Sequence, residues 1–122
     1  MRIDDAARLL EADIVGRSAD TLDEEASFAF AAELLSDVLA YGRPGHLLLT
    51  GLMGGQLIRT AEISGISAII FVKGKRPTQD MAELAARSGM PLLTTKMTLY
   101  EACGKLYEAG VAPADCNSVR GA

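Results

Sequence analysis

A threefold alternation of apolar runs and loops between residues 45 and 106 constrains the fold of this chain more than any other feature. Each apolar run is followed by a loop rich in Gly, Thr or Lys and then by an amphipathic segment, and the runs cover residues 46–50, 67–72 and 91–94. Short apolar strands that alternate with helical patterns indicate β–α–β units and a parallel sheet. The sequence therefore predicts an α/β fold whose strand-to-helix loops share one edge, where ligands usually bind.

The same periodicities predict the remaining helices and strands. The expected helices cover residues 3–11, 34–41, 56–64, 78–88 and 99–109, and further strands are expected at residues 13–15 and 26–32. Thr98 followed by Glu101 forms a capping box that starts the last helix. Because residues 112–122 are small and polar, we expect a single domain over residues 1–111 and a flexible C-terminal tail after it.

Length and composition agree with one small domain. The chain has 122 residues, of which 49% are hydrophobic, and this suffices for a core of its own. No apolar run approaches the ~20 residues of a membrane span, and Asp4 and Asp5 are unlike the basic start of a secretory signal. The two cysteines, Cys103 and Cys116, have neither CxxC nor metal-ligand spacing. We therefore expect a cytoplasmic protein that does not associate with membranes.

Charge is unevenly distributed along the chain. Residues 1–45 carry four basic and ten acidic side chains, whereas residues 46–105 carry seven basic and four acidic ones. The acidic first part argues against a nucleic-acid partner, which would need a basic surface. The basic part places Lys73, Lys75 and Lys96 in the predicted loop edge.

Two loops at the predicted edge are candidates for an anion site. The glycine-rich loop at residues 51–55 could cradle a phosphate through its N–H groups, although it lacks the P-loop and GxGxxG orders and equally suits a tight turn. The basic loop at residues 73–77 brings three cations to a helix N-terminus, where an anion would relieve an unfavourable charge; a solvated turn is the alternative. Threonine hydroxyls at the same edge could hold phosphate or carboxylate oxygens, or cap helices. The candidate ligand-binding residues are Thr50, Gly51, Gly54, Gly55, Lys73, Gly74, Lys75, Arg76, Thr94 and Thr95.

The sequence offers little for catalysis. His46 is the only histidine, and it starts a strand at the edge opposite the loops with no predictable Asp or Ser partner, so we expect a surface or half-buried residue. Cys103 lies in an expected helix beside small residues and is predicted to pack rather than to react. No cluster has metal-ligand spacing. We therefore expect no enzyme activity, no metal and no cofactor.

Four short segments carry family information through their order and spacing. They are AELLSDVLA at residues 32–40, LLTG at 48–51, AIIFVKGKRP at 68–77 and MPLLTT at 90–95. Together they resemble the DRTGG domain over about residues 2–111, and most closely the small stand-alone members found in anaerobic bacteria, often beside iron-only hydrogenase genes. The family is similar to the N-terminal domain of HPr kinase/phosphorylase. It also occurs in some phosphotransacetylases and, with CBS domains, in some pyrophosphatases.

The resemblance implies an α/β/α sandwich with a mostly parallel sheet of four to five strands, frequent dimerisation, and a regulatory or ligand-sensing role. It implies no catalysis, because in HPr kinase the P-loop belongs to the other domain. The family is named for Asp-Arg after one strand and Thr-Gly-Gly after the next. This chain departs from that pattern, since the two places hold Leu52 and Met53, and then Lys73, Gly74 and Lys75.

These observations lead to two functional hypotheses. The first is a non-catalytic regulatory module, a homodimer that acts through a protein partner and is linked to hydrogenase or energy metabolism. The alternative is a sensor that binds a small anionic metabolite or nucleotide at the C-terminal edge of the sheet.

Overall fold

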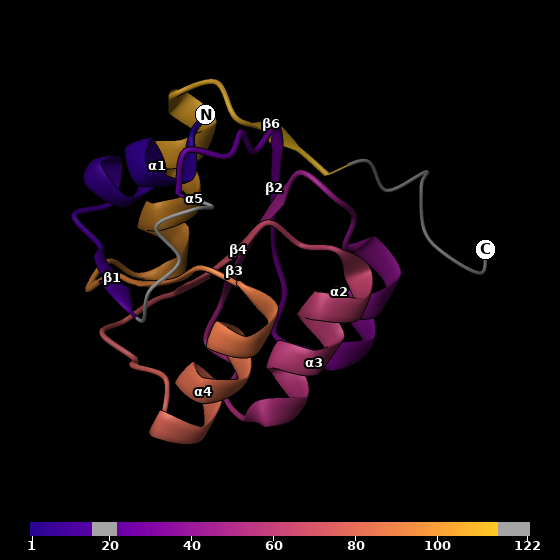
Figure 1. The fold of residues 1–122 in the computed structure, drawn as a ribbon. Coiled ribbons are helices and arrows are strands. Elements are labelled where there is room, and N and C mark those ends of the chain that lie inside the picture. The colour runs from indigo at the N-terminus through magenta and orange to yellow at the C-terminus, as the bar shows by residue number, and fades with distance from the viewer. Residues whose placement is uncertain (16–21, 115–122) are drawn as a thin grey trace.

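The computed structural model describes residues 1–15 and 22–114, and within them the chain forms five helices and six strands (Figure 1). The helices are α1 (Ile3–Leu9), α2 (Leu35–Tyr41), α3 (Gly55–Ser64), α4 (Gln79–Ser88) and α5 (Leu99–Glu108). The strands are β1 (Asp13–Val15), β2 (Phe28–Ala31), β3 (His46–Thr50), β4 (Ala68–Phe71), β5 (Leu92–Thr94) and β6 (Ala112–Pro113). The predicted elements are all present, with ends that differ by at most two residues.

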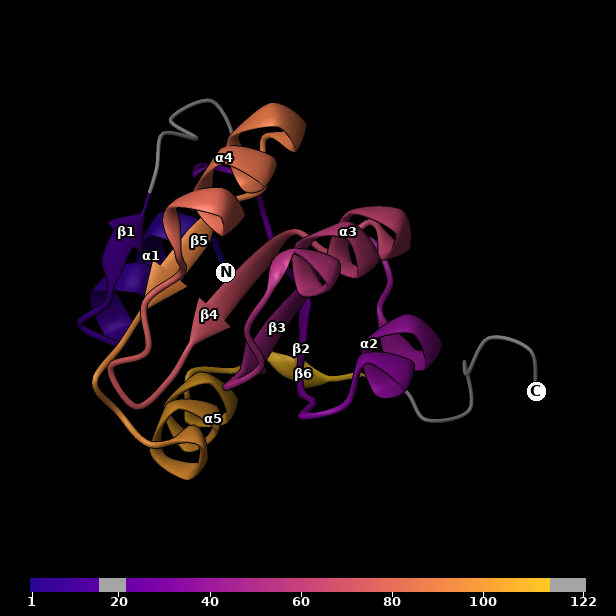
Figure 2. The ribbon, with the colours of Figure 1, turned by 90° about the horizontal axis from the view of Figure 1, so that it is seen from below.

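The strands form one mixed sheet in the order β1-β5-β4-β3-β2-β6. All neighbouring strands are parallel except β1, which pairs antiparallel with β5 at one edge. Helices cover both faces: α1 and α5 lie on one, and α2, α3 and α4 lie on the other (Figure 2). The predicted three-layer α/β/α fold with a mostly parallel sheet is confirmed, although the strand count is six rather than four to five.

The additional strand is β6, whose residues the sequence placed in a flexible tail. Ala112 and Pro113 instead pair with Phe28 and Ala29 of β2, and Ala114 N–H donates to the Ala29 carbonyl at 3.1 Å. Pro113 has no N–H to donate, which is tolerated because β6 is an edge strand. Two residues are too few for a periodic pattern, so the pairing could not be seen in the sequence. The rest of the predicted tail, residues 115–122, lies outside the described residues.

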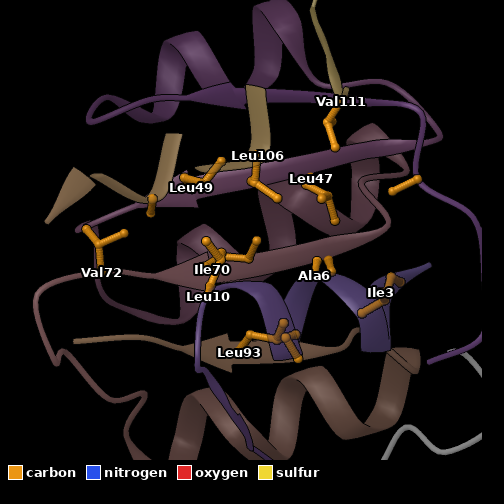
Figure 3. Close-up of a cluster of buried hydrophobic side chains, with 14 residues drawn as sticks. Ile3, Ala6, Leu10, Leu47, Leu49, Ile70, Val72, Leu93, Leu106 and Val111 are labelled. Carbon is orange, nitrogen blue, oxygen red and sulfur yellow. The ribbon is translucent and has the colours of Figure 1, made fainter. Parts of the chain in front are cut away.

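Each face of the sheet has its own hydrophobic core. Every residue of β3 and β4 is buried, as expected for central parallel strands that are covered on both sides. On the α1 and α5 face, Ile3, Ala6 and Leu10 pack against residues from three strands, and Leu106 and Val111 close the cluster (Figure 3). The strand residues in this cluster are Leu47, Leu49, Ala68, Ile70 and Leu93, with Val72 just beyond β4. Burial on both faces of the sheet explains why apolar runs, and not alternating patterns, mark these strands.

Candidate functional site

Parallel pairing brings the three predicted loops to one edge of the sheet. Thr50 of β3 lies opposite Phe71 of β4, and Phe71 lies opposite Thr94 of β5, so the three strands end side by side. Crossovers through α3 and α4 make this arrangement, because each strand must start again from the same side. The ten candidate residues therefore share one edge, as the sequence predicted, but they divide into two groups.

The threonine hydroxyls at this edge are used inside the protein. Thr50 Oγ1 donates to the Ala32 carbonyl at 2.6 Å, and Thr95 Oγ1 donates to the Leu10 carbonyl at 2.7 Å. Thr94 Oγ1 donates to the Lys75 carbonyl. All three threonines are buried. Their hydroxyl protons hold loops to strands, so an anion would have to break these bonds to be bound by them.

The first group surrounds Gly51. The Glu33 carboxylate accepts the Gly51 N–H at 3.0 Å, and Lys75 Nζ donates to the Gly51 carbonyl at 2.9 Å. A β-carbon at Gly51 would lie 3.3 to 3.4 Å from both charged groups, so glycine lets them close on this peptide from either side. The Gly54 N–H is directed to Met81 Sδ at 3.3 Å. Internal hydrogen bonds thus account for these donors, in agreement with the tight-turn interpretation of residues 51–55.

Gly55 has a packing role at the start of α3. A β-carbon there would lie 2.9 Å from Leu84 Cδ1 of α4, which is closer than real side chains approach. A larger residue at position 55 would therefore require the flexible end of the Leu84 side chain to shift. This contact favours glycine at position 55 without a ligand.

The second group lines a cavity of about 480 Å³ at the C-terminal ends of β4 and β5. The lining residues are Leu10, Glu11, Asp13, Gly74, Arg76, Thr94, Thr95, Lys96 and Met97. Four of them, Gly74, Arg76, Thr94 and Thr95, belong to the predicted candidates. The sequence already placed Lys96 at the predicted loop edge. It gave no sign that Glu11 and Asp13 lie at this cavity, because antiparallel pairing of β1 with β5 brings them here from the far end of the sequence.

The charges in this cavity are mixed. Arg76 Nη1 lies 3.1 Å from Asp13 Oδ2, and the two side chains are 60% and 71% exposed. An exposed pair of this kind contributes only about 0–1 kcal/mol to stability. Glu11 and Lys96 bring one further charge of each sign to the lining. Arg76 and Lys96 are therefore cations at a concave surface, and the Arg76 contact with Asp13 is a weak one.

Two non-glycine residues with left-handed backbone lie at or beside the cavity. Glu11 has φ 51° and lines it, while Lys73 has φ 61° and precedes the lining residue Gly74. Hydrogen bonds hold the second turn, since Lys73 N–H donates to the Met97 carbonyl at 2.8 Å and Gly74 N–H to the Thr95 carbonyl at 2.9 Å. Such conformations cost about 1 kcal/mol each and gather at functional sites.

The two residues considered for catalysis, His46 and Cys103, pack against apolar side chains. His46 is 6% exposed, with ring contacts to Phe28 at 5.5 Å and Phe30 at 5.7 Å, so the expectation of a surface or half-buried histidine was wrong. Parallel pairing with β2 places these aromatic rings over the imidazole. Cys103 packs against the core of the α1 and α5 face, and burial raises the pKa of its thiol.

In residues 1–15 and 22–114, no three His, Cys, Asp or Glu side chains gather as metal ligands, and no helix is long and apolar enough to span a bilayer.

Comparison with known proteins identifies a family for this chain and a solved structure with a similar fold. The profile described as "DRTGG domain" matches residues 5–109. No curated protein matches this chain. A similar fold occurs in the crystal structure of the CBS and DRTGG domains of the regulatory region of Clostridium perfringens pyrophosphatase, complexed with its activator diadenosine tetraphosphate. The TM-score is 0.71 at 15% identity, over 94% of this chain and 51% of that one, so this chain spans about half of that structure.

Proposed function

This chain belongs to the DRTGG domain family, and from that premise we propose that it is a cytoplasmic regulatory module which binds an anionic ligand of the nucleotide class. The cavity at the C-terminal ends of β4 and β5, with Arg76 and Lys96 in its lining, carries the proposal. The ligand of the similar pyrophosphatase region, diadenosine tetraphosphate, supports this ligand class because it is a nucleotide with several phosphates. This chain lacks the Asp-Arg and Thr-Gly-Gly residues for which the family is named. In the proposed site, the positive charge for the phosphates would therefore come from Arg76 and Lys96, which line the cavity.

On binding, a phosphate of the ligand would displace the Asp13 carboxylate from Arg76. Asp13 accepts a hydrogen bond from Arg76, and a phosphate would take over this contact with more charge and more acceptor oxygens. Lys96 would add a second positive charge as a flexible point contact. Asp13 is the first residue of β1, so its release couples ligand binding to the edge strand that pairs with β5. This coupling supplies a route from the ligand to a partner protein.

Binding of diadenosine tetraphosphate, ATP and AMP to the purified protein tests the ligand proposal by calorimetry. We expect Arg76→Ala and Lys96→Ala each to weaken the binding of a nucleotide about ten- to a hundredfold, since a hydrogen bond to a charged group contributes about 1.5–3 kcal/mol. Asp13→Asn should strengthen binding about two- to fivefold, because it removes the competing carboxylate. Arg87→Ala is the matched control, as Arg87 is an exposed arginine on α4 outside this cavity. Absence of binding for all three nucleotides, or equal affinity in the Arg76 and control variants, would refute the proposal.

The proposal includes three further parts. The module is non-catalytic, and turnover of ATP or pyrophosphate that is abolished by Arg76→Ala would contradict this. It is a homodimer, so light scattering that gives the mass of a monomer at micromolar concentration would contradict that part. It acts on a protein partner in hydrogenase or energy metabolism, which rests on the family resemblance alone. A change in hydrogenase activity on addition of the purified module and nucleotide is the expected result.

A further inference from the structure

Helix α5 presents two aromatic side chains to solvent. Tyr100 is 90% exposed and Tyr107 is 70% exposed. Ala102 and Leu106 are buried and fix the inward side of the helix, so helical periodicity places Gly104 at the centre of the outward side. A β-carbon at Gly104 would have no other heavy atom within 4 Å. The outward surface is therefore open at its centre and aromatic toward both ends.

An apolar groove runs along this helix. A cavity of about 560 Å³ lies between α5 and the sheet edge formed by β2 and β6. Its sheet side is made of apolar residues, including the aromatic Phe30, and Tyr100, Cys103 and Tyr107 contribute to its helix side. The sheet-side residues include Ala29, Leu49, Val111, Ala112 and Pro113. Burial raises the pKa of the Cys103 thiol, and this side chain adds to the apolar lining.

We propose that α5 and this groove form the interface between two copies of the chain, with the two α5 helices packed antiparallel about a two-fold axis beside Gly104. Each copy then covers the apolar groove of the other with its tyrosines. The inference rests on the homodimer of the proposed function and is independent of the ligand site.

Self-complementarity of the helix favours a second copy as the occupant. Helical periodicity places Tyr100 and Tyr107 on one flank of the outward side, and Glu101, Lys105 and Glu108 on the other. With a rise of about 1.5 Å per residue, antiparallel helices centred on Gly104 bring Tyr100 within about 2 Å, along the axis, of the partner's Tyr107. On the charged flank the same geometry brings Glu101 within about 3 Å of the partner's Lys105 and within about 2 Å of the partner's Glu108, so attraction and repulsion offset each other there. The contact of aromatic residues with aromatic residues therefore favours a second copy.

The exposed area agrees with this occupant. Aromatic side chains bury about 150–250 Å² each, so the two tyrosines offer about 300 Å² per copy at their exposures. That is over a third of the roughly 800 Å² that each partner buries in a standard interface. The groove extends the same surface, and the missing side chain at Gly104 lets the helix axes approach closely.

Sedimentation velocity of the full chain at micromolar concentration tests the interface through Gly104→Arg. We expect a dimer for the unchanged protein and a monomer for this variant, since it brings two cations together at the axis. Arginine has a higher helix propensity than glycine, so the variant should fold at least as stably, which thermal unfolding checks. Tyr107→Ala should weaken the dimer at least tenfold. Ile63→Arg is the matched control, because Ile63 is 74% exposed on α3, on the other face of the sheet, and should leave the dimer unchanged.

The outcomes separate this inference from the proposed function. A monomeric unchanged protein refutes both the homodimer and its interface. A dimer that persists in Gly104→Arg refutes the interface alone, as does dissociation by Ile63→Arg without dissociation by Gly104→Arg. The ligand proposal is tested separately, because the Arg76 and Lys96 variants are measured by nucleotide binding.

Discussion

Replacement of Glu11 by glycine should stabilise this protein, although the residue is exposed and charged. The chain leaves α1 through a turn in which Glu11 N–H donates to the Arg8 carbonyl and Ala12 N–H donates to the Ala7 carbonyl. Glu11 has φ 51° in this turn. The end of α4 has the same pair of hydrogen bonds, and there the left-handed position is Gly89 with φ 70°. Glycine is the usual residue at this position because it has no β-carbon to clash.

The expected gain is the difference between two opposing terms. A left-handed conformation costs a residue with a β-carbon about 1–2 kcal/mol, and glycine removes this cost. Glycine also loses more backbone entropy on folding, and this loss offsets the gain by about 0.5–1 kcal/mol. We therefore expect Glu11→Gly to raise the free energy of unfolding by about 1 kcal/mol and the melting temperature by about 4 °C.

Urea unfolding of three variants measures the cost of the left-handed backbone at residue 11 and separates it from the effect of losing the carboxylate. Glu11→Ala is the control, because it removes the carboxylate and keeps the β-carbon, so its stability should stay within about 0.5 kcal/mol of the unchanged protein. Gly89→Ala is the reverse change and should lower stability by about 1 kcal/mol, since its β-carbon would meet no other heavy atom within 4 Å and only the backbone is strained. Equal stability of Glu11→Gly and Glu11→Ala would refute the reasoning. Because Glu11 lines the cavity, calorimetry on the same variants reports whether this backbone conformation matters for the ligand.

Three further changes have defined effects on the free energy of unfolding, each measured by urea titration. Thr95→Val should lower it by about 1–3 kcal/mol, because the buried Leu10 carbonyl loses its hydroxyl donor; an effect below 0.5 kcal/mol would mean that this bond is not important. Ile70→Ala should lower it by about 2–5 kcal/mol through a cavity between β4 and α1, and a smaller effect would indicate that the core collapses around the site. Thr98→Ala should lower it by about 1 kcal/mol, since Thr98 Oγ1 accepts the Glu101 N–H, whereas Thr98→Ser should be nearly neutral.

The sequence determined the elements of the central sheet and their helices. The apolar runs that became β3, β4 and β5 are buried on both faces, so their composition alone marked them, and the capping threonine at residue 98 marked the start of α5. The common edge of the loops followed as well, because parallel strands joined by helices must end on the same side. These inferences are local in origin, since a residue's periodicity, cap or turn chemistry involves neighbours within a few positions.

Tertiary structure alone decided how the residues at that edge are used. The threonine hydroxyls that seemed available for a ligand are bonded to carbonyls 18 to 85 residues away, as for Thr50 with Ala32 and Thr95 with Leu10. Asp13 reaches Arg76 only because β1 pairs antiparallel with β5. The same holds for β6, whose two residues have no pattern of their own and gain a strand from the free edge of β2. A sequence specifies which groups can donate or accept a hydrogen bond, but the partner of each group depends on distances that exist only after the chain has folded.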